Sequence, residues 1–261
     1  VTATRRRLAC HTGPAWSAPS LILKEFPHHE APRAESPSHG LFHPGAPPQT
    51  ARRARTAQAP GGTGSLRIGA EFLARQQLSR KVWISNPTWV NHFQVFGAAG
   101  METAEYTYYS PATRGLDFAG MLASLEPAKA GDVVLLHGCC HNPTGVDLSP
   151  QQWEALLPVI KERELIPFLD IAYQGFGDSI IDDTFAVRML TEANISFFVS
   201  NSFSKNLSLY SERCGGLSVV CPTAEEADRV LGQLKLTVRK IYSSPPSHGA
   251  QVVSSDRKSV V

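Results

Sequence analysis

Short apolar runs alternate with stretches of helical periodicity between residues 61 and 253, and this alternation limits the chain to one class of fold. The runs are rich in β-branched and aromatic residues and recur about every 30 residues, the length of a strand-helix unit. We predict strands at residues 81–85, 103–109, 132–137, 165–170, 195–200 and 216–221. Because these runs are nearly continuous in apolar residues, we expect a mostly parallel sheet covered by helices on both sides, which is a three-layer α/β/α fold.

Three stretches between the runs have the period of an amphipathic helix, at residues 149–164, 182–194 and 223–240. The first begins at Ser149, a residue type that caps helices, and places four apolar residues on one stripe, namely Trp153, Leu156, Leu157 and Ile160. Helices with such a stripe cover the apolar face of a sheet, so they fit the layered fold.

The composition limits the partners of the chain. Its 261 residues, of which 42% are hydrophobic, suffice for one large domain. Residues 61–261 hold 17 lysines and arginines against 20 aspartates and glutamates, and this mildly acidic body gives no reason to expect a nucleic-acid partner. No apolar run approaches the ~18 residues that span a bilayer, so we expect no membrane partner either.

The cysteines indicate a reducing compartment. They are odd in number and include no C-x-x-C pair, so we expect reduced thiols and a cytoplasmic protein. The five are Cys10, Cys139, Cys140, Cys214 and Cys221.

The two ends of the chain differ from this body. Residues 1–53 are rich in proline and arginine and lack a sustained apolar period, so we expect a disordered segment or an out-of-frame translation. An Arg-rich leader is also typical of a transit peptide, although the density of proline argues against the amphipathic helix of such a peptide. The string DRKSVV at residues 256–261 is what a common sequencing adapter encodes, and we expect residues 254–261 to be an artificial tail.

Polar residues follow the predicted strands at the edge where parallel sheets bind ligands. Asp170 ends the run LIPFLD, and Lys205 follows the run ISFFV after several serines. A lysine in this position is either a solvated surface residue or an amine that forms a Schiff base. Asp170 is either a cap of a helix or turn, or a carboxylate that holds a proton on a ring nitrogen.

Amide and aromatic residues stand at the same strand ends. Asn142 lies in the turn-like stretch HNPTG, Tyr173 follows the run that ends in Asp170, and Trp89 follows the strand at 81–85. Turn chemistry is sufficient to explain Asn142, and core packing is sufficient for Tyr173. Trp89 is either a core aromatic or a plate that stacks on a flat ligand.

A glycine run directly precedes a helical period in the stretch PGGTGSLRIGAEFL, which contains Gly62 and Thr63. Backbone amides at a helix N-terminus bind phosphate, although one glycine-rich turn is a weak signal. Ser202, Ser204 and Arg213 add hydroxyl donors and a fixed cation that suit a phosphate monoester. Together the strand ends supply one amine, one partner for a ring nitrogen, one aromatic plate and one phosphate cradle, and they suggest no metal site.

Residues 54–253 closely resemble the fold-type I, pyridoxal-phosphate-dependent aminotransferases, and within them the aspartate and aromatic (tyrosine) aminotransferase subgroup. The resemblance rests on six motifs that occur in the order and spacing of the family. They are GGTG, NPTWVNH, HGCCHNPTG, DIAYQGF, SFSKNLSLYSERCGG and YSSPPSHGAQVV.

The resemblance implies that the cofactor is pyridoxal 5′-phosphate and that Lys205 carries it covalently. Lys205 would also move a proton between the substrate Cα and the cofactor C4′. Asp170 would pair with the pyridinium nitrogen, and Trp89 would stack on the ring and contact the substrate. Tyr173 and Asn142 would hydrogen-bond the phenolic oxygen of the ring, and Asn142 would also contact the substrate.

The same resemblance implies roles for residues around the ring. His141 would support Asp170 from behind. Arg239 would reach into the site of a partner subunit and hold a dicarboxylate side chain, which implies a homodimer with shared active sites. The phosphate would lie on the amides of Gly62 and Thr63 and on Ser202, Ser204 and Arg213.

The implied activity is transamination between an L-aromatic amino acid or L-aspartate and 2-oxoglutarate. Leu207, Ser208 and Cys214 resemble the aromatic branch slightly more than the aspartate branch. Residues 1–50 do not match the N-terminal arm of the family, and its small C-terminal domain is missing, so we expect the 261-residue chain to be nearly inactive alone. Three alternatives stay open: an aspartate aminotransferase proper, a cofactor-free Schiff-base lyase that uses Lys205, and a non-functional fragment.

Overall fold

The computed structural model describes residues 52–258 of the chain. Nearly all of the segment expected at residues 1–53, and the last three residues of the expected tail, therefore lie outside the described residues. The statements on structure below concern the described part.

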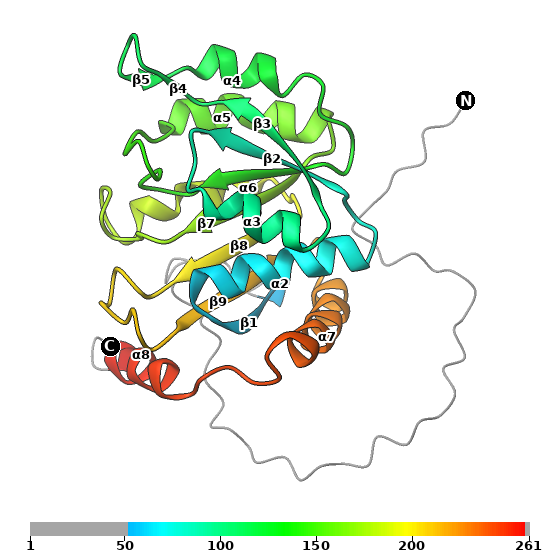
Figure 1. Ribbon diagram of the computed structural model, residues 1–261, viewed down its shortest axis with the longest axis vertical. Coiled ribbons are helices and arrows are strands. Elements are labelled where there is room, and N and C mark those ends of the chain that lie inside the picture. Colours follow the sequence, from blue (N-terminus) through cyan, green and yellow to red (C-terminus); the bar gives the residue numbers. More distant parts are fainter. Residues whose placement is uncertain (1–51, 259–261) are drawn as a thin grey trace, which may run out of the picture.

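A seven-stranded sheet forms the centre of the molecule, with β3 near one end and β1 near the other (Figure 1). The strand order is β1-β9-β8-β7-β6-β2-β3. Neighbours from β8 to β3 run parallel, and only β9 is antiparallel to its neighbours β1 and β8. The strands are β1 (Ala54–Pro60), β2 (Lys81–Asn86), β3 (Glu102–Thr107), β6 (Val133–His137), β7 (Ile166–Ile171), β8 (Phe197–Ser202) and β9 (Cys214–Val220). The short strands β4 (Tyr109–Ser110) and β5 (Gly115–Leu116) form a separate ribbon.

Helices cover both faces of this sheet. Residues of α2, α3 and α7 share one buried cluster with one sheet face, and residues of α4, α5 and α6 share a second cluster with the other face. None of the described helices is long and apolar enough to cross a membrane. The helices are α2 (Gly61–Arg75), α3 (Asn91–Ala98), α4 (Phe118–Ser124), α5 (Pro150–Glu162), α6 (Phe185–Glu192), α7 (Ala224–Ile241) and α8 (His248–Lys258), with a 3-10 turn η2 (Asp182–Thr184) before α6.

The central strands are apolar on both faces because each face packs against a helix layer. In β2, Val82 and Ile84 join the cluster of α2 and α3, whereas Trp83 between them joins the cluster of α4 and α5. The same alternation in β6 sends Val133 to one cluster and Val134 to the other. The predicted three-layer α/β/α fold with a mostly parallel sheet is confirmed.

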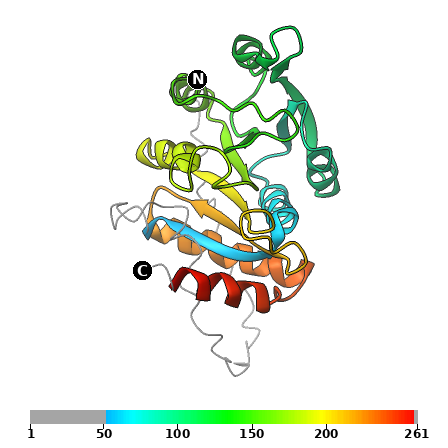
Figure 2. The same ribbon diagram turned by 90° about the vertical axis from the view of Figure 1, so that its left-hand side faces the viewer.

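All six predicted strands are present, with ends that differ by a few residues. The run predicted at 103–109 is divided, because β3 ends at Thr107 and β4 begins at Tyr109. No pattern in the sequence predicted β1, which lies along the edge that also carries α7 (Figure 2). Only Ala54 and Ala59 of this strand are buried, so its sequence ARTAQAP carries no apolar run to reveal it.

Candidate active site

One pocket opens at the carboxyl ends of β2, β6, β7 and β8, next to the first turn of α2. The space in this pocket and in its open mouth amounts to about 680 Å³. The pocket brings together ten of the twelve predicted site residues. These ten are Gly62, Thr63, Trp89, Asn142, Asp170, Tyr173, Ser202, Ser204, Lys205 and Arg213. Its other lining residues are Leu66, His137, Cys139, Ala172 and Tyr210.

Asp170 lies on the wall of the pocket with only 6% of its surface exposed. Its Oδ2 accepts a hydrogen bond from Nε2 of His92 over 3.0 Å. The Nδ1 of His92 lies 2.8 Å from Oγ1 of Thr88, so the hydroxyl donates to this nitrogen when Nε2 carries the proton. This chain of contacts orients the carboxylate and satisfies one of its oxygens inside the protein.

The support that His141 was expected to give Asp170 therefore comes from His92, and that prediction was wrong. The Nε2 of His141 bonds to Ser85 at 3.0 Å, and its Nδ1 bonds to Thr144 at 2.8 Å. After β6, both ring nitrogens of His141 bond to Ser85 and Thr144, whereas the first turn of α3 places Nε2 of His92 against Asp170. His92 stands three residues after Trp89 in the motif NPTWVNH, so its place beside a predicted site residue was the available signal.

Cationic and helix-terminal groups meet at the opposite end of the pocket. Nη2 of Arg213 donates to the carbonyl of Pro60 at 3.1 Å, and Nη1 donates to the carbonyl of Tyr210 at 3.0 Å. These bonds fix the guanidinium beside the start of α2, whose first amides have no partner within the helix. Such a helix start with a neighbouring arginine is a ready site for an anion.

Two glycines make this close approach possible. Gly61 has a φ of +74°, and a Cβ there would lie 2.4 Å from Nη2 of Arg213. A Cβ on Gly62 would lie 3.1 Å from Cβ of Ser202. The glycine run therefore lets the start of α2 lie against both Arg213 and β8.

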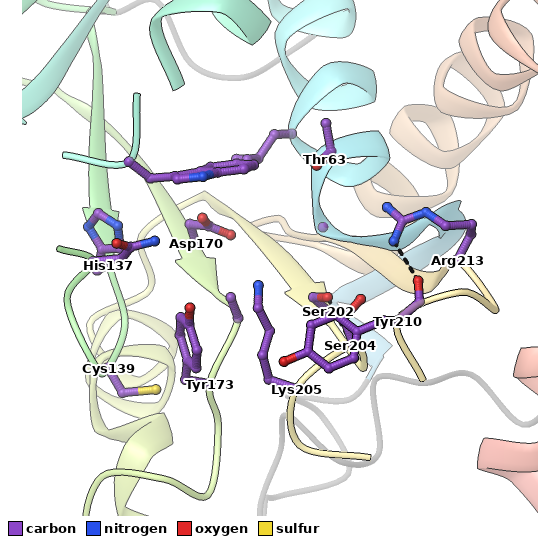
Figure 3. Close-up of a pocket in the computed structure, with 15 residues that line it drawn as sticks. Thr63, His137, Cys139, Asp170, Tyr173, Ser202, Ser204, Lys205, Tyr210 and Arg213 are labelled. Carbon is purple, nitrogen blue, oxygen red and sulfur yellow. Dashed lines mark hydrogen bonds between the residues drawn. The ribbon is translucent and has the colours of Figure 1, made fainter. Parts of the chain in front are cut away.

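Lys205 extends into the middle of the pocket from the segment after β8 (Figure 3). Asp170 and Tyr173 lie on one side of its amine, and Ser202, Ser204 and Arg213 lie on the other (Figure 3). Nζ of Lys205 lies 4.8 Å from the ring centroid of Tyr173, which is a cation-π distance. The amine thus stands between Asp170 and the anion site.

His137 is a lining residue to which the sequence analysis gave no role. Both of its ring nitrogens are buried, and neither has a hydrogen-bond partner among residues 52–258. Burial lowers the pKa of His137 well below its usual value, and the neighbouring His141 and His92 lower it further. His137 ends the run DVVLLH just as Asp170 ends LIPFLD. Its position at the end of a predicted strand was therefore a signal that could have identified it.

Arg239 does not line this pocket. It lies on the exposed last turn of α7, where its guanidinium bonds to Oγ of Ser243. Its proposed contact belongs to a partner subunit, so its role stays a prediction.

Comparison with known proteins agrees with this geometry. The chain matches the family described as aminotransferase class I and II over residues 25–255, a range that begins upstream of residue 54. It belongs to this family.

The individual relatives are named after two different substrates, tyrosine and aspartate. The chain is 55% identical over 203 residues to a tyrosine aminotransferase of Klebsiella pneumoniae. The matched residues make up 78% of this chain and 51% of that protein. It is 47% identical to an aspartate aminotransferase of Salmonella typhi over 82% of this chain and 54% of that protein. The chain thus spans about half the length of the curated relatives that it matches.

A solved structure of similar fold supports the same assignment. It is an aromatic-amino-acid aminotransferase from Burkholderia pseudomallei, covalently bound to pyridoxal phosphate. The two chains superpose with a TM-score of 0.81 at 51% identity, over 84% of this chain and 55% of that one.

Proposed function

We propose that the protein to which this chain belongs is a pyridoxal-phosphate-dependent aminotransferase. It exchanges an amino group between an L-amino acid and 2-oxoglutarate. The observation that carries this proposal is the position of the Lys205 amine, between the buried carboxylate of Asp170 and an anion site at Arg213 (Figure 3).

The residues of the pocket fit a phosphorylated pyridine aldehyde. Lys205 and Arg213 outnumber Asp170 among the charged lining residues, so the pocket favours an anionic ligand. Arg213, the start of α2 and the hydroxyls of Ser202 and Ser204 would hold the phosphate. The buried, unpartnered nitrogens of His137 indicate that the pocket wall lacks a polar partner that a bound ligand or water can provide.

Each side chain near the ring would have one task. Asp170, oriented by His92, would hold a proton on the ring nitrogen. When bound, the cofactor supplies an electron-withdrawing ring that stabilises negative charge on the substrate carbon. Tyr173 and Asn142 would donate hydrogen bonds to the ring oxygen, and Trp89 would cover the ring face. Lys205 would carry the cofactor covalently and then move the proton between Cα and C4′.

We propose aromatic amino acids as slightly favoured substrates over aspartate, as Leu207, Ser208 and Cys214 suggest. The names of the relatives support both substrate classes, so an aspartate aminotransferase proper is the second candidate. We further propose a cytoplasmic homodimer in which Arg239 serves the partner's site. The four cysteines within the described residues are all free, which fits a reducing compartment.

Amino-group transfer from L-tyrosine, L-phenylalanine and L-aspartate to 2-oxoglutarate tests the proposal. The assay uses the longest natural protein that carries residues 54–253. We expect Lys205→Ala to slow transfer by on the order of a thousandfold, because the proton carrier is lost. Lys240→Ala, which removes an exposed lysine of α7, is the matched control and keeps the rate. Transfer by Lys205→Ala at the rate of the unmodified protein would contradict the proposal.

A further inference from the structure

We propose that His92, His137 and Asp170 bind one divalent transition-metal ion, such as Zn²⁺, when no cofactor occupies the pocket. One ligand atom from each residue lies within 4.8 Å of the other two. Two imidazoles and one carboxylate form a ligand set that zinc and related metals accept, with remaining positions open to water. This site goes beyond the proposed transamination, for which no metal is needed.

The state of His137 is the first independent sign of a ligand. Among the described residues neither buried ring nitrogen has a hydrogen-bond partner, although an unsatisfied buried polar group costs free energy. A metal ion bound to either nitrogen removes part of this cost. The neighbouring His92 and His141 already have hydrogen-bond partners. Of these three histidines, His137 is therefore the one whose ring nitrogens are free to bind a new ligand.

His92 can change from a hydrogen-bond donor to a metal ligand without leaving its place. Its Nε2 now donates to Asp170, and its Nδ1 faces the hydroxyl of Thr88 at 2.8 Å. If the ring proton moves to Nδ1, that nitrogen donates to Oγ1 of Thr88 and Nε2 is free to bind the ion. A histidine ligand held through its second nitrogen in this way is usual at metal sites.

The geometry requires only a small adjustment. Two ligand atoms on a tetrahedral zinc lie about 3.4 Å apart, given bond lengths near 2.1 Å. The His92 and Asp170 atoms lie 3.0 Å apart, which is already close to this value. The His137 nitrogen lies within 4.8 Å of both atoms, so each of these two distances has to shorten by at most about 1.4 Å.

An ion can reach these atoms through the pocket. His137 and Asp170 both line it, and Figure 3 shows the two side chains on the same wall. His92 lies behind Asp170 and is fully buried, so it forms the floor of the proposed site. The site therefore opens toward the space where the ring of the cofactor would lie.

This position has a consequence for cofactor loading, which rests on the proposed function. A metal ion on Asp170 occupies the carboxylate that would hold the ring nitrogen proton. Metal and pyridoxal phosphate should therefore exclude each other, and Zn²⁺ should inhibit loading of the cofactor-free protein.

The direct test is titration of the cofactor-free chain with Zn²⁺ by calorimetry, and with Co²⁺ by visible absorption. We expect one Zn²⁺ that is lost, or bound at least tenfold more weakly, in His137→Phe. We expect Thr88→Val to weaken the same binding about tenfold, because it removes the acceptor behind His92. Co²⁺ should give the absorption of a site with nitrogen ligands in the unmodified chain and not in His137→Phe.

His141→Gln is the matched control, because it removes a neighbouring buried histidine that is not in the ligand set. Five further histidines lie in residues 1–60, and they are unchanged in every variant. Circular dichroism checks that each variant is folded, and Asp170→Asn provides a second ligand variant if His137→Phe does not fold. Equal Zn²⁺ affinity and stoichiometry in the unmodified chain and in a folded ligand variant would overturn the proposal.

A competition experiment separates this inference from the proposed function. Pyridoxal phosphate is added with and without Zn²⁺, the product is reduced with borohydride, and the Lys205 adduct is quantified by mass spectrometry. We expect Zn²⁺ to reduce the adduct several-fold in the unmodified chain and not in His137→Phe. Zn²⁺ binding without any adduct would contradict the proposed function alone, whereas an adduct unaffected by bound Zn²⁺ would contradict the overlap of the two sites.

Discussion

Two residues of the pocket wall, Asp170 and His137, differ in how their buried polar atoms are satisfied. Asp170 accepts from His92, and Thr88 holds His92 in turn, so this carboxylate belongs to a short hydrogen-bonded chain. His137 is half-buried as a residue, but both of its ring nitrogens are buried and neither has a hydrogen-bond partner among the described residues. A fold optimised for stability alone would place an apolar residue there, so this position is better explained by ligand binding than by packing.

Acid should destabilise the chain through these histidines. Burial lowers the pKa of His141 from 6.5 to about 4 and that of His137 well below its usual value. Below pH 6.5 the unfolded chain binds protons that the folded chain does not, so stability falls as pH decreases toward about 4. The slope is about 1.4 kcal/mol per pH unit for each such histidine.

Urea unfolding at several pH values between about 7.5 and 5 measures this slope. We expect His137→Phe to reduce it, because that variant has one fewer histidine to protonate on unfolding. Stability that stays constant or rises on acidification would refute this account of the buried histidines.

At the scale of elements, the sheet was predictable and parts of its surroundings were not. The central strands can be recognised in the sequence as apolar runs, because both of their faces are buried. In contrast, β1 has only two buried residues, both alanines. The eight-residue helix α3 was also missed, although it carries His92. Ten predicted site residues lie in one pocket, because the carboxyl ends of parallel strands meet at one edge of the sheet. The distinction between His92 and His141 depends on the path of two turns, which spacing along the sequence does not encode.

The contact between α2, β8 and β9 depends on a glycine in β9. A Cβ on Gly215 would lie 2.6 Å from the carbonyl carbon of Gly61 and 2.7 Å from the carbonyl oxygen of Asn201. These are backbone atoms that cannot rotate away, so we expect Gly215→Ala to destabilise the fold by about 1–3 kcal/mol.

Gly232→Ala in α7 is the counterpart of this variant. A Cβ there meets nothing within 4 Å, and alanine favours the helix, so stability should rise by up to about 1 kcal/mol. Thermal or urea unfolding of the two variants checks both signs. A Gly215→Ala chain as stable as the unmodified one would show that β8 and β9 are not held as closely as described.

At the scale of the whole molecule, the chain gathers ten predicted site residues in one pocket and spans about half the length of its relatives. Arg239 is exposed at the end of α7 and lies outside that pocket. This arrangement suits a residue that acts on a second subunit, as the proposed homodimer requires.

Mixed dimers test this division of labour in the longest natural protein that carries residues 54–253. Lys205→Ala and Arg239→Ala subunits are each expected to be poor with dicarboxylate substrates. An equal mixture, unfolded and refolded together, should regain about a quarter of the activity, because half of the dimers contain one intact site. No recovery in dimers shown to be mixed would place Arg239 in its own subunit's function.

The central claim is that Lys205 is the residue that binds pyridoxal phosphate in this pocket. Its most direct test is reduction of the 261-residue chain with borohydride in the presence of the cofactor, followed by peptide mapping. We predict one adduct on Lys205, which is reduced strongly in Asp170→Ala and unchanged in the control Lys240→Ala. An adduct on another lysine, or no adduct on a chain shown to be folded, would contradict the account.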